Sequence, residues 1–212
     1  MEQILTTFDN WTLRVRPGSS PKILLLLHGW TGNENSMSVF TKDFPTDYWI
    51  VSPRAFFPAS SGGYSWRAQA PGASWPTIDL FRPAVAALLE LLKNWSNANN
   101  IIAERVDVAG FSQGGALTFT LGALHPERFG KMGILAGFAP DGSESVVGSS
   151  TFIGKRVFVA HGTLDEMVPI DLAKRTIKIL AGAGAEVEYH ESEVGHKLSK
   201  EGLRELERYL SE

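Results

Sequence analysis

The sequence predicts an α/β fold in which a mostly parallel central sheet carries helices on both faces. Two observations lead to this prediction. Short runs that are apolar on both strand faces recur along the chain, and parallel strands covered on both sides have this composition. Helical patterns lie between most of these runs, and alternation of strand and helix is typical of a doubly wound sheet.

The strands are predicted from apolar runs that end in Gly, Pro or Ser. These runs cover residues 22–27, 49–52, 106–109, 132–135, 156–160 and, more weakly, 187–190. Residues 12–16 alternate in polarity instead, so we expect an antiparallel strand at the sheet edge there. Right-handed crossovers would place the loops after the parallel strands along one edge, where ligands bind.

Four segments have helical periodicity, at residues 78–94, 114–124, 170–181 and 199–210. Pro83 lies early in the first of them, so that helix is expected to start near it. Residues 53–76 have neither period and are rich in Pro, Gly, Ser and aromatic residues, which predicts a long functional loop. No lid-sized insertion separates the strands at 132–135 and 156–160, so no large lid domain is expected.

Length and composition favour one globular domain over residues 1–212, because cores usually split only above roughly 250 residues. Hydrophobic residues make up 43% of the chain and charged residues 20%, so a sizeable core is available. A net charge of −3 gives no electrostatic reason to bind nucleic acid or an anionic membrane. The absence of cysteine excludes disulfides, thiolate metal sites and a cysteine nucleophile.

The cytoplasm is the expected location, because residues 1–10 do not read as a signal peptide. The most apolar run, residues 23–27, is far too short for an integral membrane segment. A homodimer is one assembly that the sequence allows.

The chemistry is predicted first from Gly110-Phe111-Ser112-Gln113-Gly114, which follows an apolar strand and opens a helix. This is the setting of a nucleophile elbow, where small flanking residues permit a tight turn and the serine projects from the sheet. The pentapeptide alone is weak evidence for a nucleophile, because a serine that caps a helix beside glycines that turn the chain has the same sequence. The rest of the chain favours the catalytic interpretation.

A serine nucleophile needs a base and an orienting acid, in the order Ser, acid, His for this plan. Asp165 follows the strand at 156–160, and His196 follows the strand at 187–190, so we predict a Ser112-Asp165-His196 triad. Competing acids are Glu166, which is adjacent, and Asp171, which better suits the first turn of a helix. The other histidines have structural interpretations: His125 ends a helix, His190 lies in a strand, His161 can brace its loop, and His28 stands at a strand end.

The oxyanion donors are predicted to be the backbone N–H groups of Gln113, at the helix start, and of Trp30, in the loop after the first parallel strand. We assign Trp66, Phe111 and Met167 to the substrate pocket. No His-Glu-x-x-His run or phosphate-binding glycine loop is present, so no metal, nucleotide or other cofactor is expected.

With these residues assembled, the chain resembles the phospholipase/carboxylesterase family of small α/β-hydrolases, which includes acyl-protein thioesterases. The resemblance covers most of the chain. It is carried by His28-Gly29, the stretch Gly110 to Gly115, His125-Pro126-Glu127-Arg128-Phe129, Leu135-Ala136-Gly137, His161-Gly162 with Asp165 and Val168-Pro169, and Gly195-His196. It implies a lidless α/β-hydrolase fold and a serine hydrolase without cofactor, with the triad and oxyanion donors named above.

Two positions depart from the family pattern. Trp30-Thr31-Gly32 stands where relatives commonly carry Gly-Asp. In the long connection, relatives often have a tryptophan followed by an aromatic residue and Asp, whereas this chain has Tyr64-Ser65-Trp66-Arg67.

The predicted function is hydrolysis of small-molecule carboxylic esters of short to medium acyl length through an acyl-enzyme. Thioester or lysophospholipid deacylation is the closest alternative, and a non-catalytic binding protein of the same fold is less favoured because all three triad candidates are present. The aromatic residues of 53–76 either line an acyl pocket or cover the sheet edge, and the sequence does not choose between these roles.

Overall fold

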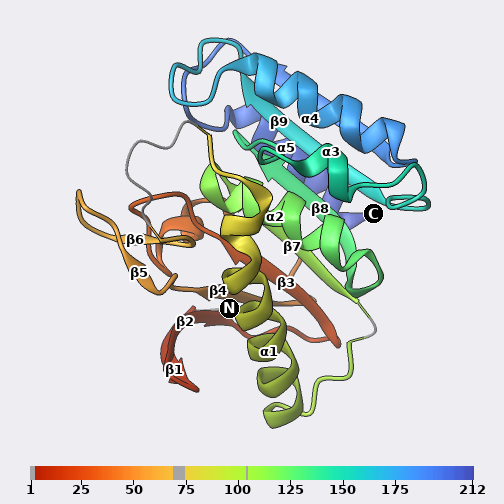
Figure 1. The fold of residues 1–212 in the computed structure, drawn as a ribbon. Helices are drawn as coiled ribbons and strands as arrows, with labels where there is room; N and C mark the ends of the chain where they lie inside the picture. Colours follow the sequence, from red (N-terminus) through yellow and green to blue (C-terminus); the bar gives the residue numbers. More distant parts are fainter. Residues whose placement is uncertain (1–2, 69–74, 104) are drawn as a thin grey trace.

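The computed structural model describes residues 3–68, 75–103 and 105–212. A central sheet of eight strands runs in the order β1-β2-β4-β3-β7-β8-β9-β10 (Figure 1). The strands are β1 (Ile4–Phe8), β2 (Trp11–Arg16), β3 (Lys22–Leu27), β4 (Tyr48–Pro53), β7 (Val106–Phe111), β8 (Phe129–Leu135), β9 (Arg156–Gly162) and β10 (Glu186–Ser192). The pairs β1–β2 and β2–β4 are antiparallel, and the other five are parallel. The prediction of a mostly parallel sheet is confirmed.

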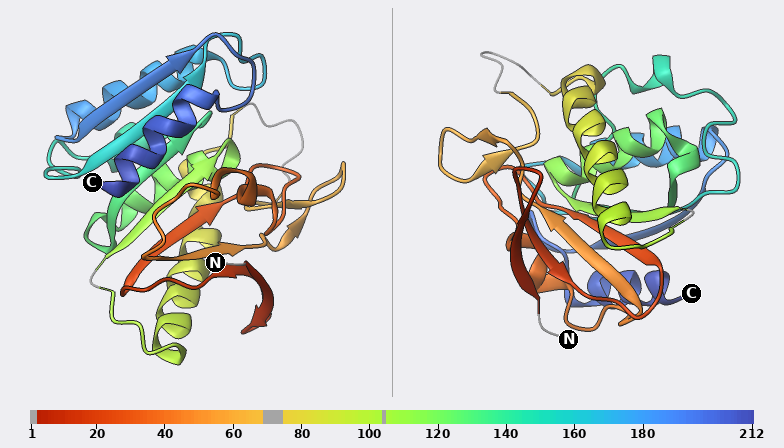
Figure 2. Two further views of the ribbon diagram at one scale, coloured as in Figure 1. Left: turned by 180° about the vertical axis from the view of Figure 1, so that it is seen from behind. Right: turned by 90° about the horizontal axis from the view of Figure 1, so that it is seen from below.

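Helices cover both faces of this sheet (Figure 2). One face carries α1 (Arg82–Ala98), α2 (Gln113–Leu124) and α4 (Ile170–Gly182), and the other carries α5 (Lys200–Ser211) and the 3₁₀ helix η1 (Ser36–Phe40). Short elements complete the described chain: η2 (Ile78–Phe81), η3 (Pro126–Arg128) and α3 (Ser143–Val146). The first predicted helix therefore begins as the 3₁₀ turn η2 and becomes α-helical next to Pro83, as that proline suggested.

The packing of strand β3 explains why its sequence is apolar after Lys22. Ile23 and Leu25 pack into the core under α1 and α2, whereas Leu24 and Leu26 belong to the core cluster on the opposite face, to which η1 and α5 contribute. A strand covered on both faces has no polar side, so its residues do not alternate. The same reasoning accounts for β7, β8 and β9, each of which lies between two other strands of the sheet.

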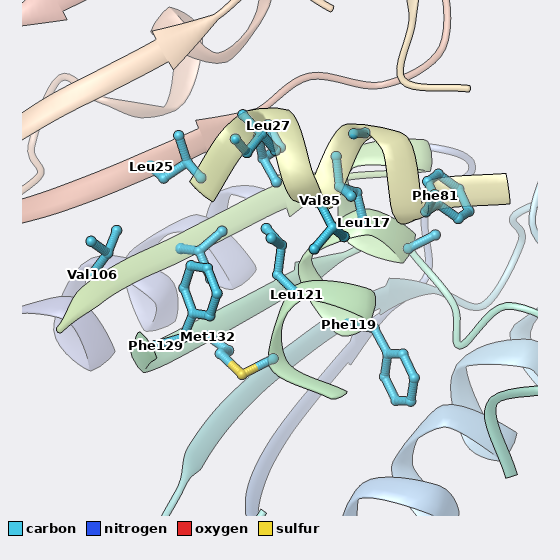
Figure 3. Packing of buried hydrophobic residues seen from close by; sticks show 14 of the residues in the cluster. Leu25, Leu27, Phe81, Val85, Val106, Leu117, Phe119, Leu121, Phe129 and Met132 are labelled. Carbon is cyan, nitrogen blue, oxygen red and sulfur yellow. The ribbon is translucent and has the colours of Figure 1, made fainter. Parts of the chain in front are cut away.

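Helix α2 is the most deeply placed helix of the described chain, since each of its first eleven residues is buried. Figure 3 shows Leu117 and Leu121 of this helix within the same cluster as Val85 of α1 and Met132 of β8. A helix enclosed on all sides has little freedom to move. Its first residue, Gln113, is therefore held as firmly as the core itself.

The segment 53–76 contains a small hairpin that the sequence did not reveal. Strands β5 (Phe57–Pro58) and β6 (Tyr64–Ser65) pair antiparallel, apart from the main sheet. Tyr64 also forms a bridge with Gly32, which lies after β3. Residues 69–74 of the predicted loop lie outside the described residues.

Within the described ranges, no helix combines the length and the apolar character needed to cross a membrane.

Candidate active site

Ser112 stands between the end of β7 and the start of α2, with backbone angles φ 55° and ψ −114°. A positive φ is uncommon for a residue with a side chain, and it is what turns the chain sharply from strand to helix. The turn is tied to the sheet by a hydrogen bond of 2.8 Å from the Ser112 amide to the carbonyl of Leu135, at the end of β8. The carbonyl of Ser112 accepts the first helical bond from the Ala116 amide, at 3.0 Å.

The glycines beside Ser112 are required by close backbone approach, as the motif predicts. A Cβ on Gly110 would lie 2.1 Å from the carbonyl oxygen of Gly114. One on Gly114 would lie 2.1 Å from the carbonyl oxygen of Leu27, on the neighbouring strand β3. Only residues without a Cβ let β3, β7 and α2 meet this closely.

Asp165 and His196 come together because their loops follow neighbouring parallel strands. Two amides of the loop after β9 tie it to the end of β10 and the loop that follows. The Thr163 amide donates to the Ser192 carbonyl at 2.8 Å, and the Leu164 amide donates to the Val194 carbonyl at 3.1 Å. Asp165 Oδ2 then lies 2.7 Å from His196 Nδ1.

The other carboxylate oxygen of Asp165 is held by its own loop. Oδ1 accepts the amides of Met167 and Val168 at 2.9 and 2.8 Å. The Asp165 side chain is fully buried, whereas the His196 side chain is 22% exposed. A carboxylate with three such partners fixes the ring of His196 and places the proton on Nδ1, which leaves Nε2 able to accept one.

His161 braces the same loop, in keeping with its predicted structural role. Its Nε2 lies 2.8 Å from the carbonyl of Val168 and 3.5 Å from Asp165 Oδ2. Since a carbonyl only accepts hydrogen bonds, Nε2 carries a proton and donates it to Val168. The buried Nδ1 has no hydrogen-bond partner within the described chain.

The competing acids lie elsewhere. Glu166 is exposed to solvent, and Asp171 stands in the first turn of α4. Neither has a hydrogen bond to a histidine within the described ranges, so Asp165 is the acid that the geometry favours.

The loop after β3 brings Trp30 to the same edge of the sheet. His28 braces this loop: its Nδ1 lies 2.7 Å from the Gly29 carbonyl, and its Nε2 accepts the Ala55 amide at 3.1 Å. Burial lowers the pKa of His28 to about 4, so the ring is neutral at pH 7. These contacts give His28 a structural role at the strand end.

A cavity of about 600 Å³ opens at this edge, and its walls include Ser112 and His196. Four lining residues come from the loop after β3, namely Gly29, Trp30, Thr31 and Gly32, and three come from η1, namely Ser36, Met37 and Phe40. Ser61, Phe111 and Met167 complete the walls. No Asp, Glu, Lys or Arg lines it among the described residues. The cavity is therefore an uncharged, largely apolar site beside the serine.

Two of the three residues assigned to the pocket line this cavity, namely Phe111 and Met167. Trp66 does not, and we correct that assignment. Its side chain is completely buried, and its indole N–H donates to the His28 carbonyl at 2.8 Å. A tryptophan in a loop rich in turn residues gave no sign of which way it would face.

Met37, Phe40 and Ser61 were missed by sequence reasoning. The first two lie in η1, whose five residues are too few to show a helical period. Ser61 lies in the turn of the hairpin, where no pattern singles it out.

The described aromatic residues of segment 53–76 do not line the cavity. Tyr64 lies against the Arg54 guanidinium, whose Cζ is 4.8 Å from the Tyr64 ring centroid, and the others pack against aromatic rings. Phe56 contacts Trp11 edge to face at 5.0 Å between ring centroids, and Trp75 contacts Phe138 in the same way at 5.0 Å. The structure thus supports the packing role for these residues.

The sequence matches the model of the Phospholipase/Carboxylesterase family over residues 15–212, which is nearly the whole chain. The chain belongs to this family. The expected resemblance and enzyme class, a hydrolase that acts on esters, are thereby confirmed.

Curated relatives of this family member include a probable carboxylesterase SOBER1-like protein of Arabidopsis thaliana. It is 29% identical over 220 aligned positions, which cover 94% of this chain and 82% of the relative. Acyl-protein thioesterase 1 of Debaryomyces hansenii is 29% identical over 139 positions, and this match spans 64% of this chain and 60% of the thioesterase.

A carboxylesterase of Bacillus cereus has the same fold in its crystal structure. It superposes with a TM-score of 0.84 at 19% identity, over 96% of this family member and 94% of that chain. The predicted α/β-hydrolase fold is confirmed.

Proposed function

We propose that this esterase-type hydrolase works through Ser112 as nucleophile, His196 as general base and acid, and Asp165 as the acid that orients the histidine. The observation that carries the proposal is the 2.7 Å contact between Asp165 Oδ2 and His196 Nδ1 at a cavity that Ser112 also lines. A buried carboxylate stabilises the imidazolium that forms when His196 takes a proton.

In the acylation half of the reaction, Ser112 Oγ attacks the ester carbonyl carbon while its proton passes to His196 Nε2. The carbonyl oxygen becomes an oxyanion, and the amides of Trp30 and Gln113 donate hydrogen bonds to it. The intermediate collapses, the bond from carbon to the alcohol oxygen breaks, and the alcohol leaves with the proton from His196.

Deacylation repeats these steps with water in place of the serine. His196 removes a proton from water, the resulting hydroxide attacks the acyl carbon, and the bond to Ser112 Oγ breaks. The proton returns to Ser112, and the carboxylic acid is released.

The cavity supports a substrate with an uncharged acyl group. Met37, Phe40 and Phe111 offer apolar contact, and no cation in the described walls would compensate a charged acyl chain. We propose short to medium acyl esters. Thioesters are the second candidate, because an acyl-protein thioesterase is among the relatives and the same triad cleaves both bonds.

The experiment measures turnover of p-nitrophenyl esters of increasing acyl length by the wild type and by Ser112→Ala. A matched series of acyl-thioesters, followed with a thiol reagent, ranks ester against thioester cleavage. The expected result is a burst and steady turnover in the wild type and loss of both in the variant. Equal turnover in the two proteins would refute the triad, and binding of esters without any cleavage would favour the non-catalytic alternative.

Three further proposals rest on the sequence. They are a single domain over residues 1–212, a cytoplasmic location and a homodimeric assembly. The continuous core cluster that runs from β2 through α1 and α2 to α4 supports the first. Limited proteolysis, cell fractionation and sedimentation test them in that order.

A further inference from the structure

We infer that the hairpin of β5 and β6 holds the two proposed oxyanion donors at a fixed separation, and that the side chain of Gln113 is the positioning group through which it acts on the serine turn. This inference rests on the proposed function, because it concerns the amides assigned to the oxyanion. It gives the segment 53–76 a role that neither of the sequence-based alternatives contained.

The hairpin first binds the loop that carries Trp30. The Thr31 amide donates to the Tyr64 carbonyl at 3.0 Å, and the Tyr64 amide donates to the Gly32 carbonyl at 3.0 Å. Thr31 has φ 67°, an unusual conformation for a β-branched residue that its surroundings must maintain. Contact is so close that a Cβ on Gly63 would lie 1.9 Å from the Thr31 carbonyl oxygen.

The next two residues of the hairpin bind the serine turn. The Trp66 amide donates to Gln113 Oε1 at 2.9 Å, and Gln113 Nε2 donates to Ser65 Oγ at 3.0 Å. The orientation of the Gln113 amide follows from these partners, because a backbone N–H only donates. Ser65 Oγ gives its own hydrogen to the Arg67 carbonyl at 2.8 Å, so it is free to accept from Gln113.

A third contact joins the hairpin to the strand from which the Trp30 loop departs. The indole of Trp66 donates to the His28 carbonyl at 2.8 Å and lies against the His28 ring, with centroids 4.9 Å apart. Residues 64, 65 and 66 therefore contact both sides of the oxyanion site in succession. Gln113 is 7% exposed and His28 1%, so water cannot readily replace these bonds.

This arrangement matters because one oxygen atom must receive both hydrogen bonds. Donors are effective at 2.7–3.1 Å from the oxyanion, so a small change in the distance between the Trp30 and Gln113 amides weakens one of them. Trp30 lies in a loop and is 42% exposed, whereas Gln113 opens a buried helix. The hairpin transmits the rigidity of α2 to the looser of the two donors.

The test uses Gln113→Met, which keeps the length of the side chain and the backbone amide but removes both side-chain hydrogen bonds. We expect kcat to fall about 10- to 100-fold, the range that a misplacement of up to about 1 Å produces, while KM changes less than about twofold. Binding of a trifluoromethyl ketone, which mimics the tetrahedral intermediate, should weaken by the same factor as kcat/KM.

Ser65→Ala is a milder variant that removes only one partner, and it should lower kcat less. In a double-mutant cycle, adding Ser65→Ala to Gln113→Met should cost almost nothing further, because the contact is already lost. Ser143→Ala is the matched control, since Ser143 is a buried serine outside the site whose Oγ donates to Pro140. It should leave kcat unchanged.

Active-site titration with a fluorophosphonate separates the outcomes. If Gln113→Met only unfolds part of the sample, the titrated fraction falls but kcat per titrated site and ketone binding stay at wild-type values, which overturns the inference. Wild-type kcat in both variants overturns it as well. Failure of the wild type to be labelled on Ser112 instead overturns the proposed function, and the inference with it.

Discussion

Replacing Gly114 with alanine tests whether the serine turn depends on the contact between α2 and β3. The new Cβ would lie 2.1 Å from the carbonyl oxygen of Leu27 and 2.7 Å from that of His28, and both are backbone atoms that no side-chain rotation can remove. To restore ordinary contact, which begins near 3.4 Å, helix and strand must separate by about 1.3 Å.

A displacement of that size reaches both proposed oxyanion donors, because α2 begins with Gln113 and β3 leads to Trp30. Misplacement of about 1 Å costs roughly 100-fold in rate, so kcat/KM for a p-nitrophenyl ester should fall by about that factor. Overpacking costs typically 1–3 kcal/mol, which corresponds to a fall in Tm of roughly 2 to 12 °C for a domain of this size.

Gly182→Ala is the control. Gly182 ends α4, and a Cβ there would meet no atom within 4 Å. Activity should stay at the wild-type level, and the free energy of unfolding should rise by about 0.4–1 kcal/mol because the unfolded chain loses freedom. Steady-state kinetics and thermal unfolding measure both variants. Wild-type kcat/KM and Tm in Gly114→Ala would refute the reasoning.

Three other predictions use the same assays. Asp165→Asn should lower kcat about 10⁴-fold with little change in KM, because an amide cannot hold the required tautomer of His196 or stabilise its imidazolium. Asp171→Asn is the control. A loss of kcat under tenfold in Asp165→Asn would contradict the role of Asp165 as the orienting acid. Burial lowers the pKa of His28 from 6.5 in the unfolded chain to about 4 in the folded protein. Between these pH values the unfolded chain therefore binds more protons than the folded protein does. The contribution of His28 to the free energy of unfolding should accordingly fall by about 3 kcal/mol as the pH drops from 6.5 to 4. Urea unfolding at several pH values should show a flatter profile for His28→Gln, and an equally steep one argues against this residue as the cause. Arg54→Met should lower the free energy of unfolding by about 2–4 kcal/mol, because it leaves the buried Glu34 carboxylate, which lies 2.7 Å from Arg54 Nε, without its charged partner. The loss should stay below the full value for a buried pair because Arg54 is partly exposed. Adding Glu34→Gln should restore part of the lost stability, and no recovery would show that the unpaired charge is not the cause.

The middle of the sheet could be predicted because burial on both faces leaves a direct mark on the sequence. After Lys22 and Arg156, residues 23–27 and 157–160 are apolar without interruption, and the structure places them in β3 and β9 between two helical layers. At the sheet margin this signal disappears. Four of the five residues of β1 are exposed, so its hydrogen bonds to β2 left no pattern by which to find it.

The pairing of Asp165 with His196 could be predicted because it depends on strand order. Both residues follow strands whose ends reach the same edge of the sheet, and they follow Ser112 in the order acid, histidine that the plan requires. The role of the Gln113 side chain could not be predicted in this way. Its partners are a backbone amide and a hydroxyl in a hairpin whose strands have two residues each, and neither composition nor spacing marks them.

Three residues with side chains adopt positive φ where the chain leaves neighbouring strands of the sheet: Thr31 after β3, Ser112 after β7 and Ala136 after β8. Each such conformation costs on the order of 1–3 kcal/mol and persists only where the surroundings impose it. The working geometry of this edge is therefore maintained against a local tendency to relax, and the whole sheet supplies the restraint. Substitutions that let any one of these turns relax should make the protein more stable and less active. The proposed catalytic edge would then limit how stable this fold can become while the protein still turns over substrate.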